Sequence, residues 1–178
     1  MCETIKLDLI DVFTSRGKIR TEELSYDFTE FDLTHTTYPV VSKSPISLRF
    51  EAIEVGKIRL TGNFSVVLEI PCDRCLTPCN ETVECEFDQE LFSEEELSKL
   101  DEAEEVSFLH NTEFDVYDFV NLNVLMNMPS KVLCQDDCKG LCPVCGSNLN
   151  ETDCGCDSFV PDPRMARIAD IFNESKEV

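Results

Sequence analysis

The chain has 178 residues, of which 15 are basic and 36 acidic, so its formal net charge is −21. This length suits one domain with a small addition, and the plentiful Leu, Ile, Val and Phe argue against a disordered acidic tail. No apolar run approaches the roughly 18 residues of a membrane-spanning helix, and the first residues lack the basic-then-apolar pattern of a signal peptide. We therefore expect a soluble, cytoplasmic protein that does not bind membranes.

The first 45 residues give a weak secondary-structure signal. A short strand is predicted where apolar residues alternate with polar ones, at Ile5, Leu7 and Leu9. Residues 14–45 show no clear period and are expected to be partly loop, with Pro39 and Pro45 as breakers.

An antiparallel meander is predicted from residue 46 to residue 91. Apolar residues recur at every second position, as in half-buried strands: Ile46, Leu48, Phe50, Ala52, Ile58, Leu60, Phe64, Val66, Leu68, Ile70, Val83, Cys85, Phe87 and Leu91. Turns are predicted at Gly56 and at Gly62-Asn63, and the Cys72–Cys75 segment is expected at the tip of a hairpin.

Helical signals follow the meander. Ser93 and Glu96 form a capping-box pattern, which predicts a short acidic helix to about Leu100. One more strand is expected over 106–116.

A second helix is predicted to begin at Asp118 and to end at Pro129. Its core-facing stripe is expected to be Phe119, Leu122, Leu125 and Met126. A third helix is predicted from Asp162-Pro163 onward, with the apolar stripe Met165, Ile168, Ala169 and Phe172.

These elements predict an α+β fold. We expect an antiparallel β-sheet or partly closed barrel with a few helices and a C-terminal Cys-rich zinc module. Residues 1–130 would form the sheet domain, including the Cys72/Cys75 hairpin, and residues 131–178 would hold the Cys-rich segment and the last helix, packed on the same domain. No internal repeat is predicted.

Eleven cysteines need an explanation. In a reducing compartment, clustered cysteines favour metal binding over disulfides. Eight of them form close pairs: Cys72/Cys75, Cys134/Cys138, Cys142/Cys145 and Cys154/Cys156. Pairs of this kind let one turn of chain supply two ligands to a tetrahedral zinc ion. The sequence therefore predicts two structural zinc sites made of cysteines alone.

Two groupings of these pairs are possible. One closes a local site within 15 residues: Cys142, Cys145, Cys154 and Cys156. It leaves the remaining pairs for a second site: Cys72, Cys75, Cys134 and Cys138. The rival grouping joins Cys134, Cys138, Cys142 and Cys145. An iron–sulfur cluster uses the same ligands, and a redox-active thiol pair is a further interpretation.

The remaining cysteines and the histidines give no catalytic signal. Cys85 is expected to be a buried thiol in a strand, Cys2 lies at the chain end, and Cys79 is the best candidate for a spare ligand. His35 and His110 are isolated, and no phosphate loop or nucleophile motif is present. A metal bound by four cysteines has no open position, so we expect no small-molecule substrate.

Acidic residues concentrate between residues 81 and 118, which carry 15 acidic groups and one basic group, a net of −14. A solvated acidic face is one interpretation. The other is a docking surface for a basic partner, carried by Glu94, Glu95, Glu96, Glu102, Glu104 and Glu105. Direct binding to nucleic acid is disfavoured, because that binding depends on Lys and Arg at phosphates.

The segment from Leu133 to Asn150, with Cys142-Pro143-Val144-Cys145-Gly146, resembles the YceD-like family, which is named for large ribosomal RNA subunit accumulation. Cys154-Gly155-Cys156, Asp162-Pro163-Arg164 and the upstream Cys72-Asp73-Arg74-Cys75 match the same family. The resemblance implies a role in the accumulation or processing of large-subunit (23S-type) rRNA.

We therefore expect a non-enzymatic factor in ribosome biogenesis. Its partner would be a basic ribosomal protein or a large-subunit assembly factor, with weak or no binding to naked RNA. The alternatives are an RNA-processing enzyme and a thiol-based redox sensor.

Overall fold

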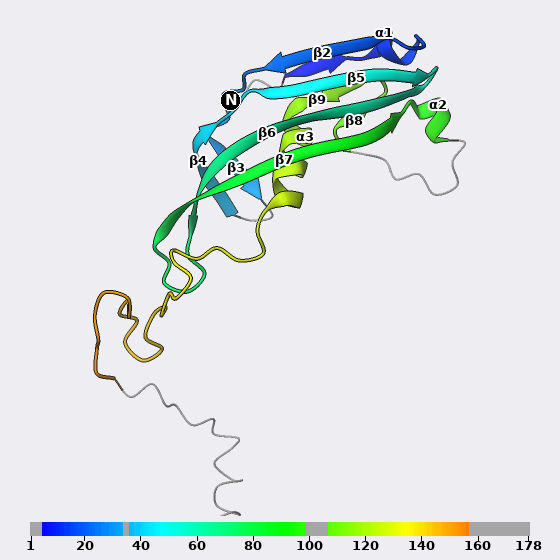
Figure 1. Cartoon of the computed structure of the whole chain (residues 1–178). Helices are drawn as coiled ribbons and strands as arrows, with labels where there is room; N and C mark the ends of the chain where they lie inside the picture. The colour runs from blue at the N-terminus through cyan, green and yellow to red at the C-terminus, as the bar shows by residue number, and fades with distance from the viewer. Residues whose placement is uncertain (1–4, 34–35, 99–106, 157–178) are drawn as a thin grey trace, which may run out of the picture. The chain divides into compact units, whose positions relative to one another are not determined.

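The computed structural model describes residues 5–33, 36–98 and 107–156 (Figure 1). Residue contacts divide the chain into two units. The first, here called the sheet unit, comprises Met1–Pro71 and Pro78–Val132. The second, the Cys-rich unit, comprises Cys72–Thr77 and Leu133–Val178. The loop that carries the first cysteine pair thus groups with the later cysteines, whereas the sequence-based division placed it with the sheet.

The sheet unit contains two antiparallel sheets. The larger has the order β2-β5-β6-β4-β3, with β7 paired to the other edge of β6. Its strands are β2 (Ile19–Leu24), β3 (Glu30–Leu33), β4 (Thr36–Lys43), β5 (Ile46–Glu54), β6 (Lys57–Pro71) and β7 (Pro78–Phe92). The smaller sheet joins β1 (Lys6–Asp8), β9 (Glu113–Asp115) and β8 (Leu109–His110). Among the described strands, β2, β3 and β7 each pair on one side only, so the large sheet is open rather than a barrel.

Three helices accompany the sheets within the described residues: α1 (Ile10–Phe13), α2 (Glu94–Leu97) and α3 (Val116–Asn127). The predicted α+β class, with mainly antiparallel sheet, is confirmed. None of the described helices has the length and apolar composition needed to cross a membrane.

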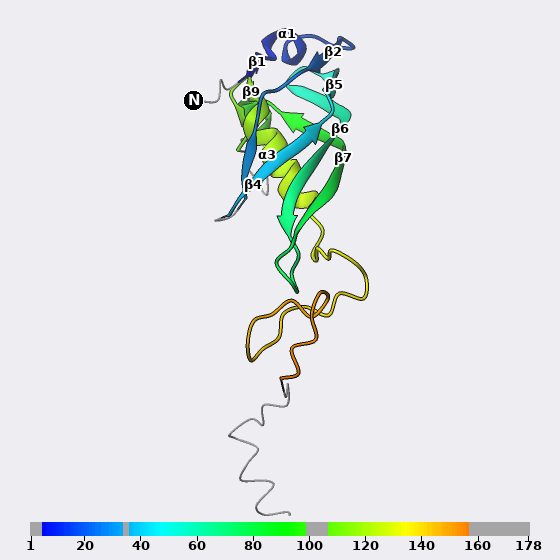
Figure 2. The ribbon, with the colours of Figure 1, turned by 90° about the vertical axis from the view of Figure 1, so that its left-hand side faces the viewer.

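The core of the sheet unit lies between the large sheet and α3 (Figure 2). Alternate side chains of β5, β6 and β7 point into it, as the period of two predicts. The ring of Phe119 on α3 lies 4.8 Å from Phe87, 5.1 Å from Phe108 and 5.0 Å from Phe114, measured between ring centroids. These aromatic contacts hold the helix against the sheet.

Gly62 is not in a turn, contrary to the prediction. It lies inside β6, paired with Leu48 of β5 and Phe87 of β7. A Cβ atom at this position would lie 1.9 Å from the carbonyl oxygen of Ser47. Only glycine allows the two strands to come this close, so Gly62 is needed for strand packing and not for a turn.

Residues 14–45 contain more strand than predicted, namely β2, β3 and β4. Pro39 lies within β4 opposite Glu30, and pairing of β4 with β6 begins only at Val40. At Pro39 the strand therefore has a neighbour on one side only, where a missing N–H is tolerated. Pro45 lies between β4 and β5, as predicted.

The helix predicted from Asp118 begins earlier. Asp115 is its N-cap, and its Oδ1 accepts hydrogen bonds from the amides of Tyr117 and Asp118 at 2.9 and 3.2 Å. The predicted strand over 106–116 is instead the β8–β9 hairpin, which turns at Asn111 with φ of 56°.

The buried face of α3 also differs from the predicted stripe. The buried residues are Val116, Phe119, Val120 and Val124. Of the predicted stripe only Phe119 is buried, whereas Leu122, Leu125 and Met126 are exposed. The helix ends before Pro129 as predicted, with Met128 extended.

The acidic helix after β7 is shorter than predicted. Ser93 is the N-cap residue of α2, but its side chain makes no capping hydrogen bond. Leu100, where this helix was expected to end, and the helix predicted from Asp162 lie outside the described residues.

Candidate metal centres

Eight cysteines form two groups of four in the Cys-rich unit. The first group is Cys72, Cys75, Cys134 and Cys138, and the second is Cys142, Cys145, Cys154 and Cys156. Within each group all four Sγ atoms lie within 4.8 Å of one another. The structure thus contains the first of the two predicted groupings of cysteines and not the rival one.

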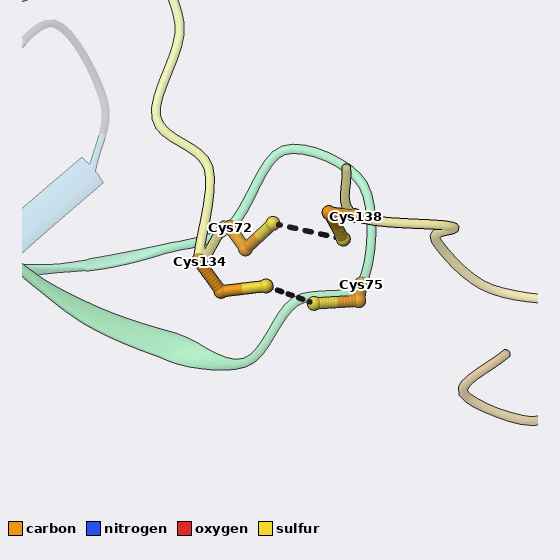
Figure 3. Close-up of side chains that lie close together, drawn as sticks. All are labelled: Cys72, Cys75, Cys134 and Cys138. Atoms are coloured by element: carbon orange, nitrogen blue, oxygen red, sulfur yellow. Dashed lines mark hydrogen bonds between the residues drawn. The ribbon is translucent and has the colours of Figure 1, made fainter. Parts of the chain in front are cut away.

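The first centre joins two segments that are far apart in sequence. In Figure 3 the sulfurs of the Cys72–Thr77 loop face those of the later segment. The Sγ atoms of Cys72 and Cys138 are 3.8 Å apart, and those of Cys75 and Cys134 are 3.5 Å apart. All of these cysteines are free thiols. A single ion bound tetrahedrally at about 2.3 Å holds its sulfurs about 3.8 Å apart, so the first centre has the dimensions of a mononuclear site.

The second centre is built on a local hairpin. Leu141 pairs with Asn148, and the Cys142–Cys145 turn lies between them. Cys154 and Cys156 then return to the same place.

The first cysteine pairs of the two centres have the same backbone geometry. The amide of Cys72 donates to the carbonyl of Thr77, and the amide of Cys142 to the carbonyl of Ser147, each at 2.9 Å. The amides of Leu76 and Gly146 close the inner turns onto the carbonyls of Cys72 and Cys142, again at 2.9 Å. Leu76 and Gly146 both have positive φ, 61° and 75°. Each centre therefore contains one copy of the same cysteine turn, which could supply two ligands to a metal ion.

A hydroxyl side chain also recurs in the two turns. The Sγ of Cys75 lies 3.2 Å from Oγ1 of Thr77, and the Sγ of Cys145 lies 3.2 Å from Oγ of Ser147. The sequence pattern Cys-x-x-Cys-x-Thr/Ser is thus an internal repeat that the sequence reasoning missed. The shared hydroxyl residue was the available signal, and the leucine in place of glycine concealed it.

Asn150 organises the first centre and was not predicted. Its Nδ2 donates to the Sγ of Cys138 at 3.3 Å, and its Oδ1 accepts from the amide of Lys139 at 2.8 Å. Arg74 contributes a second contact, because its Nη1 donates to the carbonyl of Cys138 at 2.7 Å. The bond from Asn150 to Cys138 Sγ favours the thiolate form, and the two backbone contacts position the Cys138 segment.

In each group, local interactions lower the pKa of one thiol and raise the pKa of another. Burial raises the pKa of Cys72, but hydrogen bonds from the amides of Arg74, Cys134 and Cys75 outweigh it and lower this pKa to about 6. The adjacent sulfur of Cys75 raises the pKa of Cys134. A bound cation is what allows all four thiols to ionise together, because it neutralises their mutual repulsion.

The second centre shows the same division. The hydroxyl and amide of Ser147 lower the pKa of Cys145 to about 6. The sulfurs of Cys145 and Cys154 raise the pKa of Cys156 to about 12.

The Cys-rich unit has no apolar core among its described residues. All buried side chains of the hydrophobic cluster belong to the sheet unit. The residues of the Cys-rich unit counted as buried hydrophobics are Cys72, Cys75, Cys138 and Cys142. The thiols thus occupy the place that a hydrophobic core has in other small domains.

Of the other cysteines and the histidines singled out in the sequence, none of the described ones belongs to either group of four. Cys79 is in β7 and does not join either group of four, while Cys85 is buried in the same strand, and burial raises its pKa to about 11. His110 is in β8. Cys2 and His35 lie outside the described residues.

The structure describes half of the predicted docking residues. Glu94 and Glu95 are exposed on α2, whereas Glu96 is half-buried. Glu102, Glu104 and Glu105 lie outside the described residues.

Comparison with known proteins identifies relatives. The family model described as large ribosomal RNA subunit accumulation protein YceD matches residues 60–172, more than half of the chain. Uncharacterized proteins of Mycobacterium bovis and Mycobacterium tuberculosis are 27% identical over 134 residues, which cover 74% of this chain. The chain spans 63% of the length of those relatives. No solved structure matches the chain significantly. The family match covers both cysteine groups, and the chain belongs to the YceD family of large ribosomal RNA subunit accumulation proteins.

Proposed function

We propose that each centre binds one zinc ion with a structural role. The sulfur separations of the first centre, 3.5 and 3.8 Å, support a single tetrahedral ion. A cluster of several irons binds its cysteines to different iron atoms, which holds the sulfurs farther apart than the 4.8 Å limit in either group. With four cysteine ligands no position is open for a substrate, so the metal supplies folding energy rather than chemistry.

The shared turn leads to a prediction for a matched pair of variants. Replacing Gly146 with leucine should weaken the second centre about fivefold, because a left-handed Leu costs about 1 kcal/mol. Replacing Leu76 with glycine removes this strain from the first centre and should leave it at least as strong. The rate of zinc transfer to a chelator measures both effects. Equal weakening by the two changes would contradict the equivalence of the turns.

We further propose that the protein is a non-enzymatic factor in large-subunit ribosome assembly in the cytoplasm, and that it supports rRNA accumulation through a basic protein partner. The observation that carries this proposal is the family match over residues 60–172. Charge supports a protein partner over bare RNA. Two filled sites, each with four thiolates and one dication, take the formal charge from −21 to about −25.

Three basic residues of β5 and β6 also support this choice of partner. Lys57 pairs with Glu90 at 2.7 Å, and the Nε of Arg59 donates to Asp88 at 2.7 Å. Arg49 contacts Glu51 at 3.3 Å. These cations are already balanced by carboxylates, so they offer little net charge to phosphate groups.

Capture of partners from lysate tests the proposal. The full-length protein, with and without nuclease treatment, should retain large-subunit ribosomal proteins or assembly factors that survive nuclease, as read by mass spectrometry. Retention of RNA alone, lost on nuclease treatment, would contradict it. Tight and sequence-selective binding to protein-free rRNA fragments would contradict it as well.

The acidic docking residues make a separate prediction. Changing Glu94, Glu95, Glu96, Glu102, Glu104 and Glu105 together to glutamine should slow association with the captured partner by about tenfold at low salt and by less at high salt. Zinc content should stay unchanged, because none of these residues is a ligand. Stopped-flow association rates at two salt concentrations measure the effect. An unchanged rate would show that these residues are only a solvated surface.

A further inference from the structure

The outer edge of β7 is unpaired among the described strands. β7 forms a continuous ladder of fifteen residue pairs with β6, from Lys57–Phe92 to Pro71–Pro78. On its other side no described strand is paired with it, and Figures 1 and 2 show it at the border of the large sheet. Such a long free edge is a template for one more strand.

The register shows which backbone groups point to this edge. The amide of Ser93 donates to the carbonyl of Gly56 at 2.8 Å, just beyond the end of the ladder. In an antiparallel ladder hydrogen-bonded and non-bonded pairs alternate, so the odd-numbered residues of β7 bond to β6. The even-numbered residues direct their N–H and C=O groups outward. Pro78, which has no N–H, fits this assignment because it lies in a non-bonded pair with Pro71.

The same even-numbered residues carry a column of carboxylates on the solvent face. Glu84, Glu86, Asp88 and Glu90 are all exposed. Asp88 and Glu90 pair with cations of β6. Glu84 and Glu86 lie opposite Ser65 and Asn63, and neither has an ion pair within the described residues. Within the part of the chain that the structure describes, two carboxylates in the middle of this edge thus have no cationic partner.

We propose that the β7 edge binds an extended basic segment of a protein partner as an additional antiparallel strand. The segment would carry Lys or Arg at every second position. Because the outward N–H and C=O groups belong to the acidic residues, each hydrogen-bonded pair would place a partner side chain directly opposite a carboxylate. The inference rests on the proposed basic protein partner and identifies where and in what conformation it binds.

The charge pattern selects against other occupants of this edge. A second copy of β7 would place carboxylates opposite carboxylates, which is destabilising. Nucleic acid would bring phosphates to the same column. A shallow hollow of about 240 Å³ lies on the β6 side of Glu84 and Glu86 and is also lined by Ser44, Asn63, Phe64, Ser65 and Cys85.

A synthetic peptide tests the edge on the full-length, zinc-loaded protein. The probe has about ten residues, with Lys alternating with Thr and with blocked ends. One control has the same composition with its Lys in one block, and a second carries N-methyl groups on the amides of its Lys residues. We expect the alternating peptide to bind about tenfold more tightly than either control. We also expect it to slow amide exchange at Glu84 and Glu86.

A proline variant separates backbone pairing from charge. Thr82 is exposed at an even-numbered position, so Thr82→Pro removes an outward N–H while leaving the ladder with β6 and all charges intact. It should weaken peptide binding by about tenfold, whereas the matched Thr82→Ala should change it by less than about twofold. If Thr82→Pro fails to fold, the N-methylated peptide makes the same test on the unaltered protein.

Two results would overturn the inference. One is equal binding of the alternating and block peptides, and the other is unchanged amide exchange in β7 on binding. Capture from lysate distinguishes this failure from failure of the proposed function. If Thr82→Pro retains the same ribosomal proteins as the unaltered chain, the surface is wrong and the function stands. If the unaltered chain retains none, the function fails whatever the peptide does.

Discussion

Removal of zinc by a strong chelator is expected to unfold the Cys-rich unit and to leave the sheet unit folded. The described part of the Cys-rich unit buries cysteines and contributes nothing to the hydrophobic cluster, so the proposed zinc ions would supply its stability. Structural zinc contributes roughly 10 kcal/mol of apparent binding energy in small zinc-binding peptides. The sheet unit keeps its own apolar core and has no need of the metal.

Hydrogen exchange read by mass spectrometry measures this difference. The amides of Cys72, Leu76, Cys142 and Gly146, which are hydrogen-bonded in the turns, should lose protection on chelation, while those of β5 and β6 keep it. Cys138→Ser should remove about one zinc per chain, whereas the control Cys79→Ser should remove none. Metal-free protein with fully protected turns would contradict a structural role for zinc.

Replacing Phe119 with alanine is expected to destabilise the sheet unit by about 3–5 kcal/mol. The side chain is fully buried, and its ring contacts three other aromatic rings of the core. The truncation removes these contacts and leaves a cavity between α3 and the sheet. Denaturant unfolding followed by circular dichroism measures the loss of stability, and the zinc content of the folded protein should not change.

Met126 provides the matched control on the same helix. Its side chain is 76% exposed, so Met126→Ala should change the free energy of unfolding by less than about 0.5 kcal/mol. A large loss of stability at Met126 together with a small one at Phe119 would mean that the stripe predicted from the sequence faces the core. The pair therefore tests the orientation of α3 as well as the strength of the core.

The long strands with one buried face were predictable, whereas β3, which buries only Phe31 and Leu33, was too short to be recognised. From Ile46 to Ile70 the apolar residues alternate because one side of β5 and β6 faces the core. β2 was missed because only its terminal residues, Ile19 and Leu24, are apolar, so no alternation appears between them. Gly62 was wrongly predicted in a turn. Glycine is needed there because a side chain would collide with the carbonyl of Ser47 on the neighbouring strand, which is a tertiary contact.

The helix α3 shows a different limit of pattern reasoning. Apolar residues lie on several of its sides, so a period of 3.6 residues fits more than one stripe. The N-cap was predicted at Asp118 instead of Asp115, so Val116 lay outside the predicted helix. The remaining pattern then favoured Leu122 and Met126 over Val120 and Val124.

The four pairs of cysteines were predictable from the sequence, but the choice between the two groupings and the surroundings of the sulfurs were not. Proximity in sequence did not decide the grouping, because the rival set from Cys134 to Cys145 is at least as local as the set from Cys142 to Cys156. Nothing local connects Cys75 to Cys134, so only the fold shows that their sulfurs meet. Asn150 was missed because an isolated asparagine has no distinguishing pattern, and its role depends on the approach of Cys138.

The separation of Cys72 and Cys138 by 66 residues has a consequence for biosynthesis. A ribosome that adds about 5–20 residues per second exposes the first two thiols roughly 3–13 s before the last ligand of the first centre. During that interval the hairpin tip presents a half-made site with two of its four ligands. The second group of four is completed only at Cys156, so the ligand sets of the two proposed zinc ions are completed one shortly after the other. A chain that stops before Cys134 would thus carry its sheet strands and an exposed thiol pair without partners.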